Sequence, residues 1–438
     1  MSKTYRAWHP DQQWLLPPSP REWLPENDLV YFVMDVAKQL DLGAITRVYE
    51  QSERGYPPFH PQMMACLLIY GYCIGVRSSR QIAQRCERDA AFRVIVGEDI
   101  PDFRTISLFR KTHLEAFAEL FVQVLQIARE AGLVKLGHLS LDGTKIKASA
   151  SRHKAMSYGR MKQEEARLRQ EIKDLLAQAE ATDQQEDGRY GQESRGDELP
   201  KELSRRQDRL AKIQAAKAAL EERARQKQDD DENGPGSGEV KVEDKAQYNF
   251  TDPESRIMKA NNKGWDQSGN AQAVVDSTAQ IIVAADVTDQ ANDSRQMEPM
   301  LEQAKQNVGE EAEMKRVSLD AGYFSESNVD WLQKQKIDGY VATGRLKHGQ
   351  RVAAAPRGRA PKGLSCKEYM ARKLRTLKGR ATYARRKAIV EPVFGQLKRV
   401  MGFRQFLLRG LKQMRGEWRL ACLCYNVRRL FGAGLAMA

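Results

Sequence analysis

The sequence predicts a mixed α/β protein that begins with a helical region and carries an inserted helical hairpin. Apolar residues recur at helical spacing through residues 1–135, and the period changes to strand-like alternation from His138 to Ala148. Two heptad-like segments then interrupt the α/β pattern. We therefore expect a helical N-terminal domain at 1–135, a core at 136–155 and 240–438, and an inserted hairpin with a flexible linker at 156–239.

In the N-terminal region, helix-start signals precede three apolar-periodic segments. The predicted helices are 61–72, opened by Pro61; 80–96, capped by Ser78 or Ser79; and 106–132, capped by Thr105. Short helices joined by tight turns fit a helix-turn-helix DNA reader, but a plain helical bundle fits the same periodicity. The longest uncharged apolar run, 63–76, is shorter than the roughly 20 residues of a bilayer span, so we expect a buried helix and no membrane partner.

The residue pattern of the core region predicts a mixed five-stranded sheet with flanking helices. Strands are expected at 138–148, 270–276, 280–288, 315–319 and 339–343, and helices at 294–308 and 328–336. The second and third strands form a hairpin, which gives the layer an antiparallel edge.

In the insertion, apolar residues repeat every seven positions in 161–182 and again in 203–220. A polar segment at 183–200 is expected to join the two helices, and 229–239 is expected to form a flexible linker. We expect the two heptad stripes to close on each other rather than on a partner chain.

Basic charge is concentrated near the end of the chain. Residues 345–387 contain fifteen Lys or Arg and one acid, residues 388–438 contain nine bases and two acids, and residues 1–344 are net acidic. Such an asymmetric field favours a polyanionic partner, above all nucleic acid, although a solvated basic surface is the alternative. Because it has few apolar residues, 345–387 is expected to be mobile without DNA.

The six cysteines show no disulfide-framework spacing, and five lie in apolar or amphipathic helical segments. This pattern favours reduced thiols. The N-terminus also lacks the apolar core of a signal peptide, so we expect a cytoplasmic protein.

Three carboxylates stand out by context. Asp142 interrupts an apolar strand, Asp320 ends the strand before Ala321 and Gly322, and Glu391 precedes Pro392 near an expected helix start. Three carboxylates on different elements can hold hard divalent cations, and no His/Cys set has zinc spacing.

Four other carboxylates compete for this role because they also lie near strand ends: Asp252, Asp286, Asp289 and Asp293. We interpret Asp252 as a turn residue and Asp293 as the cap of helix 294–308.

At these positions the sequence resembles the DDE transposases of bacterial insertion sequences. The segments LSLDGTKIKA, VSLDAGYFSE and RRKAIVEPVFGQLKRVMGFRQFLLRG look like the three acidic blocks of that family. The helical segment from PPFHPQMMAC to SLFRKTH and the segment YNFTDPESRIMK are also similar to the group with a long helical insertion.

The resemblance implies a ribonuclease-H-like core in which Asp142, Asp320 and Glu391 bind two Mg²⁺ ions, with Mn²⁺ as a substitute. It also implies that Lys398 contacts transposon-end DNA. In the family signature Tyr-x2-Arg-x3-Glu the base lies four residues before the glutamate, where this chain has Lys387, and the pair Tyr383 and Arg386 is offset by one residue. We expect the following residues to contact DNA as well: Tyr383, Arg386, Lys387, Lys145 and Arg256.

The expected function is metal-dependent cleavage at transposon ends, followed by strand transfer into target DNA. The alternatives are a nuclease or resolvase on the same core, and a DNA-binding derivative without catalysis. The expected partner is double-stranded DNA, namely the terminal inverted repeats and the target, bound by a homodimer or larger assembly associated with the nucleoid. Within the chain, we expect the helical domain at 1–135 to be a DNA-binding domain.

Overall fold

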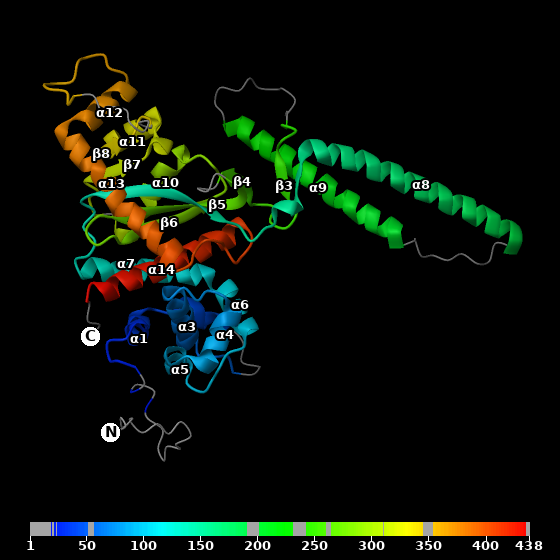
Figure 1. Ribbon diagram of the computed structural model, residues 1–438, viewed down its shortest axis with the longest axis horizontal. Helices are drawn as coiled ribbons and strands as arrows, with labels where there is room; N and C mark the ends of the chain where they lie inside the picture. Colours follow the sequence, from blue (N-terminus) through cyan, green and yellow to red (C-terminus); the bar gives the residue numbers. More distant parts are fainter. Residues whose placement is uncertain are drawn as a thin grey trace, which may run out of the picture.

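The protein consists of a helical layer, a mixed sheet with flanking helices, and a long projecting helical hairpin (Figure 1). The computed structural model describes residues 19, 22, 24–50, 57–190, 201–230, 242–259, 264–309, 311–344 and 354–434. None of the helices in these ranges is both long enough and apolar enough to cross a membrane.

In the part of the chain that the structure describes, seven helices precede the first strand: α1 (Leu29–Gln39), α2 (Gly43–Glu50), α3 (Pro61–Cys73), α4 (Ser79–Arg88), α5 (Ala90–Val96), α6 (Phe103–Thr112) and α7 (Leu114–Glu130). The predicted helix 80–96 is divided, because the Asp89 carboxylate caps α5 at Ala91 N. The predicted helix 106–132 begins earlier, with Asp102 rather than Thr105 as its cap, and is interrupted at His113. As expected, the apolar segment after Pro61 is a buried helix.

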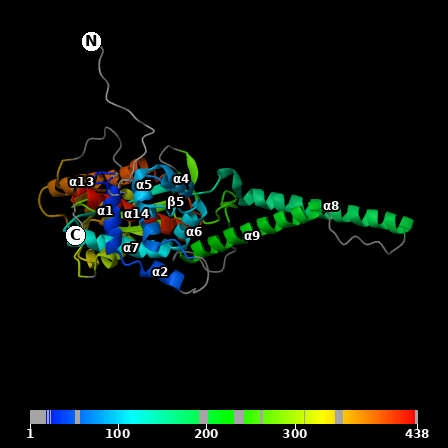
Figure 2. The ribbon, with the colours of Figure 1, turned by 90° about the horizontal axis from the view of Figure 1, so that it is seen from below.

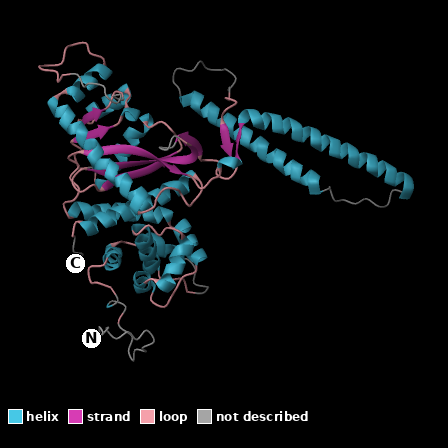
Figure 3. Ribbon diagram, viewed as in Figure 1, coloured by secondary structure: helices cyan, strands magenta, loops and turns pink. Residues whose placement is uncertain are grey.

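The sheet contains β1 (Leu139–Lys147), β4 (Arg256–Lys259), β5 (Trp265–Asp276), β6 (Ile282–Thr288), β7 (Arg316–Leu319) and β8 (Asp338–Val341). Its order is β4-β5-β1-β7-β8, and β6 also pairs with β5. The β1–β5 pairing is antiparallel, whereas β1–β7 and β7–β8 are parallel. Figure 3 shows the strands in magenta with helices around them. All five predicted strands are present. The sheet also contains a sixth strand, the four-residue edge strand β4, which was not predicted.

The α-helices that follow β6 among the described residues are α10 (Met297–Val308), α11 (Glu326–Lys334), α12 (Cys366–Arg375), α13 (Leu377–Gly395) and α14 (Leu411–Gly432). The basic segment is helical from Cys366 onward, because a capping box of Ser365 and Glu368 begins α12. Its mobility without DNA stays a prediction. Residues 345–353 lie outside the described residues.

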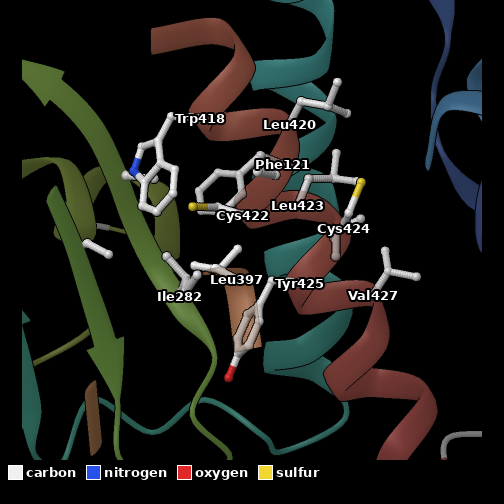
Figure 4. Packing of buried hydrophobic residues seen from close by; sticks show 14 of the residues in the cluster. Phe121, Ile282, Leu397, Trp418, Leu420, Cys422, Leu423, Cys424, Tyr425 and Val427 are labelled. Carbon is white, nitrogen blue, oxygen red and sulfur yellow. The ribbon is translucent and has the colours of Figure 1, made fainter. Parts of the chain in front are cut away.

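One apolar cluster joins the N-terminal helices to the sheet through α14. Figure 4 shows Trp418 and Cys422 of α14 near Ile282 of β6, with Phe121 of α7 close by. The Trp418 Nε1 also donates a hydrogen bond to the Gln272 carbonyl of β5 at 2.9 Å. The helical region and the sheet therefore share one hydrophobic core. The predicted boundary near residue 135 separates two parts of the sequence that both contribute to this core.

The predicted hairpin is formed by α8 (Tyr158–Tyr190) and α9 (Lys201–Asp230), which extend away from the sheet (Figures 1 and 2). A two-stranded sheet of β2 (Ala155–Ser157) and β3 (Gln247–Asn249) lies at its base. The hairpin has a separate apolar cluster, consisting of Met161, Leu168, Ile213, Ala216 and Leu220. Helix α8 continues through 183–190, where a polar tip was expected, and 191–200 and 231–239 lie outside the described residues.

Candidate active site

Asp142 and Asp320 lie side by side because neighbouring parallel strands carry them. Leu141 of β1 is in register with Leu319 of β7, and each aspartate is the next residue in its chain. Asp142 is 21% exposed, and its Oδ1 accepts a hydrogen bond from Gly143 N at 2.9 Å. Asp320 Oδ1 accepts from Gly322 N at 2.7 Å, at the start of a 3-10 turn. The sequence predicted Asp142 inside the first strand and Asp320 at the end of a later one, and both positions are confirmed.

The Asp142 carboxyl has its pKa raised to about 6 from an ordinary value of 3.8. Burial is the main cause, and the negative charge of Asp320 adds to it. The guanidinium of Arg386 acts in the opposite direction and lowers the pKa. The two aspartates are therefore close enough to repel each other, and they form a partly buried acidic centre.

Cations from α13 and the π-helical turn η5 (Gln396–Val400) reach this centre. Arg386 Nη1 donates a hydrogen bond to Asp142 Oδ2 at 3.0 Å, and its guanidinium lies 5.9 Å from the Tyr383 ring centroid. Lys398 Nζ donates to Thr144 Oγ1 on β1; burial lowers the pKa of Lys398, and the Asp142 charge opposes that effect. Lys387 is exposed, so Arg386 rather than Lys387 is the base that faces Asp142.

Glu391 is exposed and makes no hydrogen bond or ion pair with a residue that the structure describes. The expectation that it lies near a helix start is wrong, because α13 begins at Leu377 and Pro392 is inside it. Since Pro392 has no N–H, the Ala388 carbonyl instead accepts from Gln280 Nε2 at 2.9 Å. Within the described ranges, no group of three His, Cys, Asp or Glu side chains is arranged to hold a metal ion.

Asp293 was misassigned as a helix cap. Its side chain makes no capping hydrogen bond, and it belongs to the acidic centre instead. Its Oδ1 accepts hydrogen bonds from Asn270 Nδ2 at 2.6 Å and Gln272 Nε2 at 2.8 Å, and lies 3.6 Å from Lys145 Nζ. The helix α10 that it was expected to cap begins only at Met297.

Two glycines permit this arrangement. A Cβ at Gly143 would collide with Gln272 Nε2 and lie 3.0 Å from Asp293 Oδ1. A Cβ at Gly322 would lie 3.0 Å from Asp320 Oδ1 and 3.3 Å from Asp293 Oδ2. The buried Tyr323 reports the same clustering, because burial raises the pKa of its hydroxyl and the charges of three aspartates raise it further: Asp293, Asp142 and Asp320.

The other competing carboxylates lie elsewhere. Asp286 pairs with Arg419 at 3.3 Å, and Asp289 pairs with Arg256 at 2.6 Å. The Asp252 carbonyl accepts from Ser255 N at 3.1 Å, which confirms a turn. Of the predicted DNA-contacting residues, Arg386, Tyr383, Lys398 and Lys145 lie around the acidic centre, whereas Arg256 is held on β4 by Asp289.

Comparison with protein families gave two matches. Residues 236–427 match the transposase DDE domain, and residues 18–112 match a transposase domain designated DUF772. Asp320 and Glu391 lie within the first match, and Asp142 lies between the two. Comparison with curated proteins and with solved structures gave no match. The two matches cover most of the N-terminal helical region and most of the core after the hairpin. The protein belongs to the insertion-sequence DDE transposases, enzymes that cut and rejoin DNA.

Proposed function

We propose that Asp142, Asp320 and Glu391 are the three acidic residues of the transposase active site. DDE transposases generally use divalent metal ions, and we propose Mg²⁺, with Mn²⁺ as a substitute. The observation that carries this proposal is the strand register that sets Asp142 beside Asp320. Carboxylate oxygens are the ligands that these hard cations prefer.

The two aspartates fit a divalent cation in charge as well as in donor type. They are partly buried and they repel each other, as the raised pKa of Asp142 indicates. A cation held by both would relieve that repulsion. Glu391 would complete the donor set from α13, and no contact with a described residue has to break for its exposed carboxylate to bind.

The sheet supports a ribonuclease-H-like core. Strands β6, β5 and β1 are antiparallel neighbours, and β1, β7 and β8 are parallel neighbours. We propose that β4 is an addition to the edge of this core, and that the hairpin α8–α9 is an insertion after its first strand.

The proposed reaction is phosphoryl transfer without a covalent enzyme intermediate. When bound, divalent cations would stabilise the attacking and leaving oxygens of a phosphodiester. The chain itself supplies positive charge for the DNA backbone from Lys398 and Arg386, beside Asp142. We propose that Tyr383, Lys387 and Lys145 extend this DNA contact, and that two or more protomers act on paired ends.

The test uses Asp142→Asn, Asp320→Asn and Glu391→Gln, which remove charge but keep shape. Each is expected to abolish Mg²⁺-dependent cleavage of donor-end DNA while DNA binding persists. Glu302→Gln, an exposed position on α10, is the matched control and should cleave normally. A variant that cuts at close to the parental rate would remove that residue from the triad. Cleavage by the parent without strand transfer would instead favour a nuclease.

A further inference from the structure

The turn between α3 and α4 packs against the end of η5, the π-helical turn that carries Lys398. Arg77 in this turn is 12% exposed. Its Nη2 donates a hydrogen bond to the Gly402 carbonyl at 2.9 Å, and its Nη1 donates to the Gln405 carbonyl at 3.0 Å. The guanidinium also lies 4.5 Å from the Phe403 ring centroid. One planar side chain from the N-terminal helical region therefore spans the loop that follows η5.

Two glycines bring the backbones together at this point. Gly75 has a φ of +83° and Gly402 has a φ of +63°, values that glycine adopts without a steric penalty. A Cβ at Gly75 would lie 3.0 Å from the Val400 carbonyl oxygen, and a Cβ at Gly402 would lie 3.8 Å from the Gly75 carbonyl oxygen. The turn and the end of η5 are therefore in backbone contact, and Arg77 fixes that contact.

The loop in turn fixes the backbone of η5. Arg404 Nε donates to the Lys398 carbonyl at 3.1 Å. Met401 N donates to the Gln396 carbonyl at 2.9 Å, which is the i→i+5 hydrogen bond of a π turn. Because one residue turns a helix by about 100°, the extra residue in this turn determines the direction in which Lys398 points.

The same loop is aligned with the end of β1, the strand of the first aspartate. Gln405 forms a parallel bridge with Lys147, and the next residue, Phe406, donates from its N to the Lys147 carbonyl at 2.8 Å. Strand β1 also carries Thr144, whose Oγ1 accepts a hydrogen bond from Lys398 Nζ. The loop therefore holds η5 and β1 in one arrangement at the acidic centre.

A buried carboxylate anchors the far side of the loop. Glu417 of α14 is 0% exposed, and its Oε2 accepts from Leu407 N at 2.9 Å and Leu408 N at 3.2 Å. Its Oε1 lies 3.7 Å from Arg77 Nη1. Removing the cation beside a buried carboxylate is destabilising, so the loss of Arg77 affects stability as well as geometry. Arg77→Lys keeps a positive charge near Glu417 and separates the two effects, because an ammonium cannot reproduce the planar fork of a guanidinium.

We propose that Arg77 is a positioning residue for Lys398. By bridging the carbonyls of Gly402 and Gln405, it holds the π turn in the arrangement that directs the Lys398 ammonium to the acidic centre. This inference rests on the proposed function in one respect, namely that Lys398 contacts DNA at that centre. Arg77 acts through Lys398 and not on a reacting group. The N-terminal helical region thus helps to set the geometry of the active site, apart from any DNA contact of its own.

The first test measures the reactivity of the Lys398 amine in the full chain, without DNA or metal. Arg77→Gln should raise its rate of reductive methylation about three- to ten-fold, the factor that corresponds to one lost hydrogen bond. Arg77→Lys should raise it less. The rate is followed by mass spectrometry below the unfolding transition, and the exposed Lys387 on α13 is the internal reference, which should react equally in all variants.

The matched control for this test is Arg129→Gln. Arg129 of α7 also joins the N-terminal helices to the core through a backbone carbonyl, because its Nη1 donates to the Val308 carbonyl at 2.6 Å. Its replacement should lower thermal stability and leave the methylation rate of Lys398 at the parental value. An unchanged rate at Lys398 in both Arg77 variants would overturn the proposal, and so would an equal rise in the control.

The second test is a double-mutant cycle of Arg77→Gln and Lys398→Gln on the cleavage of donor-end DNA. Arg77→Gln alone should lower kcat about ten- to a hundred-fold, because a small displacement of a positioned group costs that much. In the Lys398→Gln background the same change should have little further effect, since no ammonium is left to position. Equal losses in both backgrounds would indicate a purely structural role and overturn the proposal.

The two tests also separate this proposal from the proposed function. Parental cleavage by Lys398→Gln would count against the DNA contact of Lys398, and cleavage by Asp142→Asn would count against the triad. Neither result alters the methylation rate of Lys398, which decides by itself whether Arg77 positions that amine.

Discussion

The guanidinium of Arg386 donates a hydrogen bond from Nη1 to Asp142 Oδ2 at 3.0 Å, across 244 positions of sequence. Both side chains are largely buried, at 11% and 21% exposure. Arg386 therefore supplies part of the positive charge that Asp142 needs, and burial still raises the pKa of Asp142 to about 6. Any cation that binds Asp142 shares it with Arg386 and competes with a proton.

We expect Mg²⁺ binding to weaken as the pH falls through about 6, because Asp142 becomes protonated. Arg386→Gln removes a charge that lowers the pKa of Asp142, so the midpoint should move to higher pH. The measurement is the rise in unfolding temperature caused by Mg²⁺, followed from pH 5 to 8. Lys387→Gln is the matched control, since Lys387 is the exposed neighbour, and it should keep the parental midpoint. An unmoved midpoint in Arg386→Gln would show that Asp142 does not control cation binding.

Without a cation, the same shift has a defined effect on stability. The folded protein holds a proton on Asp142 between about pH 4 and 6, where the unfolded chain has released it. Stability should therefore fall as the pH rises through this interval. The comparison is urea unfolding of the parent and of Asp142→Asn at both ends of the interval. The difference in stability between the two proteins should itself change with pH, and a difference that stays constant would contradict the assigned pKa.

Asp293 offers a test between a cap and a buried network. If it were a cap, Asp293→Asn would cost little, because Asn caps helices as well as Asp does. In the structure its charge faces Lys145, and its oxygen accepts from Asn270 and Gln272. We expect Asp293→Ala to lower the free energy of unfolding by about 1–3 kcal/mol. Asp293→Asn should also lower the free energy of unfolding measurably. If urea unfolding gave the Asn variant parental stability, the interpretation of Asp293 as a helix cap would be supported instead.

Asp142 and Asp320 could be placed from sequence because each interrupts or ends a short apolar strand, and strand alternation is a local property. The choice between Arg386 and Lys387 could not be made in that way. One residue turns a helix by about 100°, so the base that faces Asp142 depends on how α13 packs. Pro392 led to the wrong helix start for Glu391, because proline favours a first helical turn. Here it lies inside α13, and the Ala388 carbonyl that it leaves without a helical donor accepts from Gln280 instead.

Asp293 was missed for a related reason. An acidic residue just before a helical segment looks locally like a cap, whereas its actual partners come from β1 and β5, twenty or more residues away in sequence. The heptads of the hairpin, by contrast, are local signals and predicted its pairing. The four-residue strand β4 is too short to show a period.

The basic segment can now be tested at defined positions. Lys373 is tied to Asp338 at 2.7 Å and is a poor candidate for DNA contact. Six exposed bases are better candidates: Arg357, Arg359, Lys362, Lys367, Arg375 and Arg385. Changing all six to Gln should make the slope of log affinity against log salt shallower by about five. Lys373→Gln, the control, should lower stability with little effect on the slope. An unchanged slope in the sixfold variant would place this surface away from DNA.

The hairpin can be shortened without exposing its base. Its apolar cluster includes Met161, Leu168 and Leu220, and partly buried Tyr248 and Phe250 of the core side pack against it. Removing the whole insertion would uncover those aromatic rings. Replacing residues 170–209 by a short Gly/Ser link keeps the basal cluster and removes the projecting arms, and loop length by itself costs little entropy.

We therefore expect the shortened protein to unfold cooperatively at close to the parental temperature. What should weaken is strand transfer on paired ends, because an arm that projects so far from the sheet is placed to reach a second protomer or DNA. Thermal unfolding, single-end binding and strand transfer are measured on the same preparation. Normal single-end binding with reduced strand transfer would assign the arms to assembly. A shortened chain that does not fold would show that the distal arms stabilise the core, and full strand transfer would show that they are dispensable.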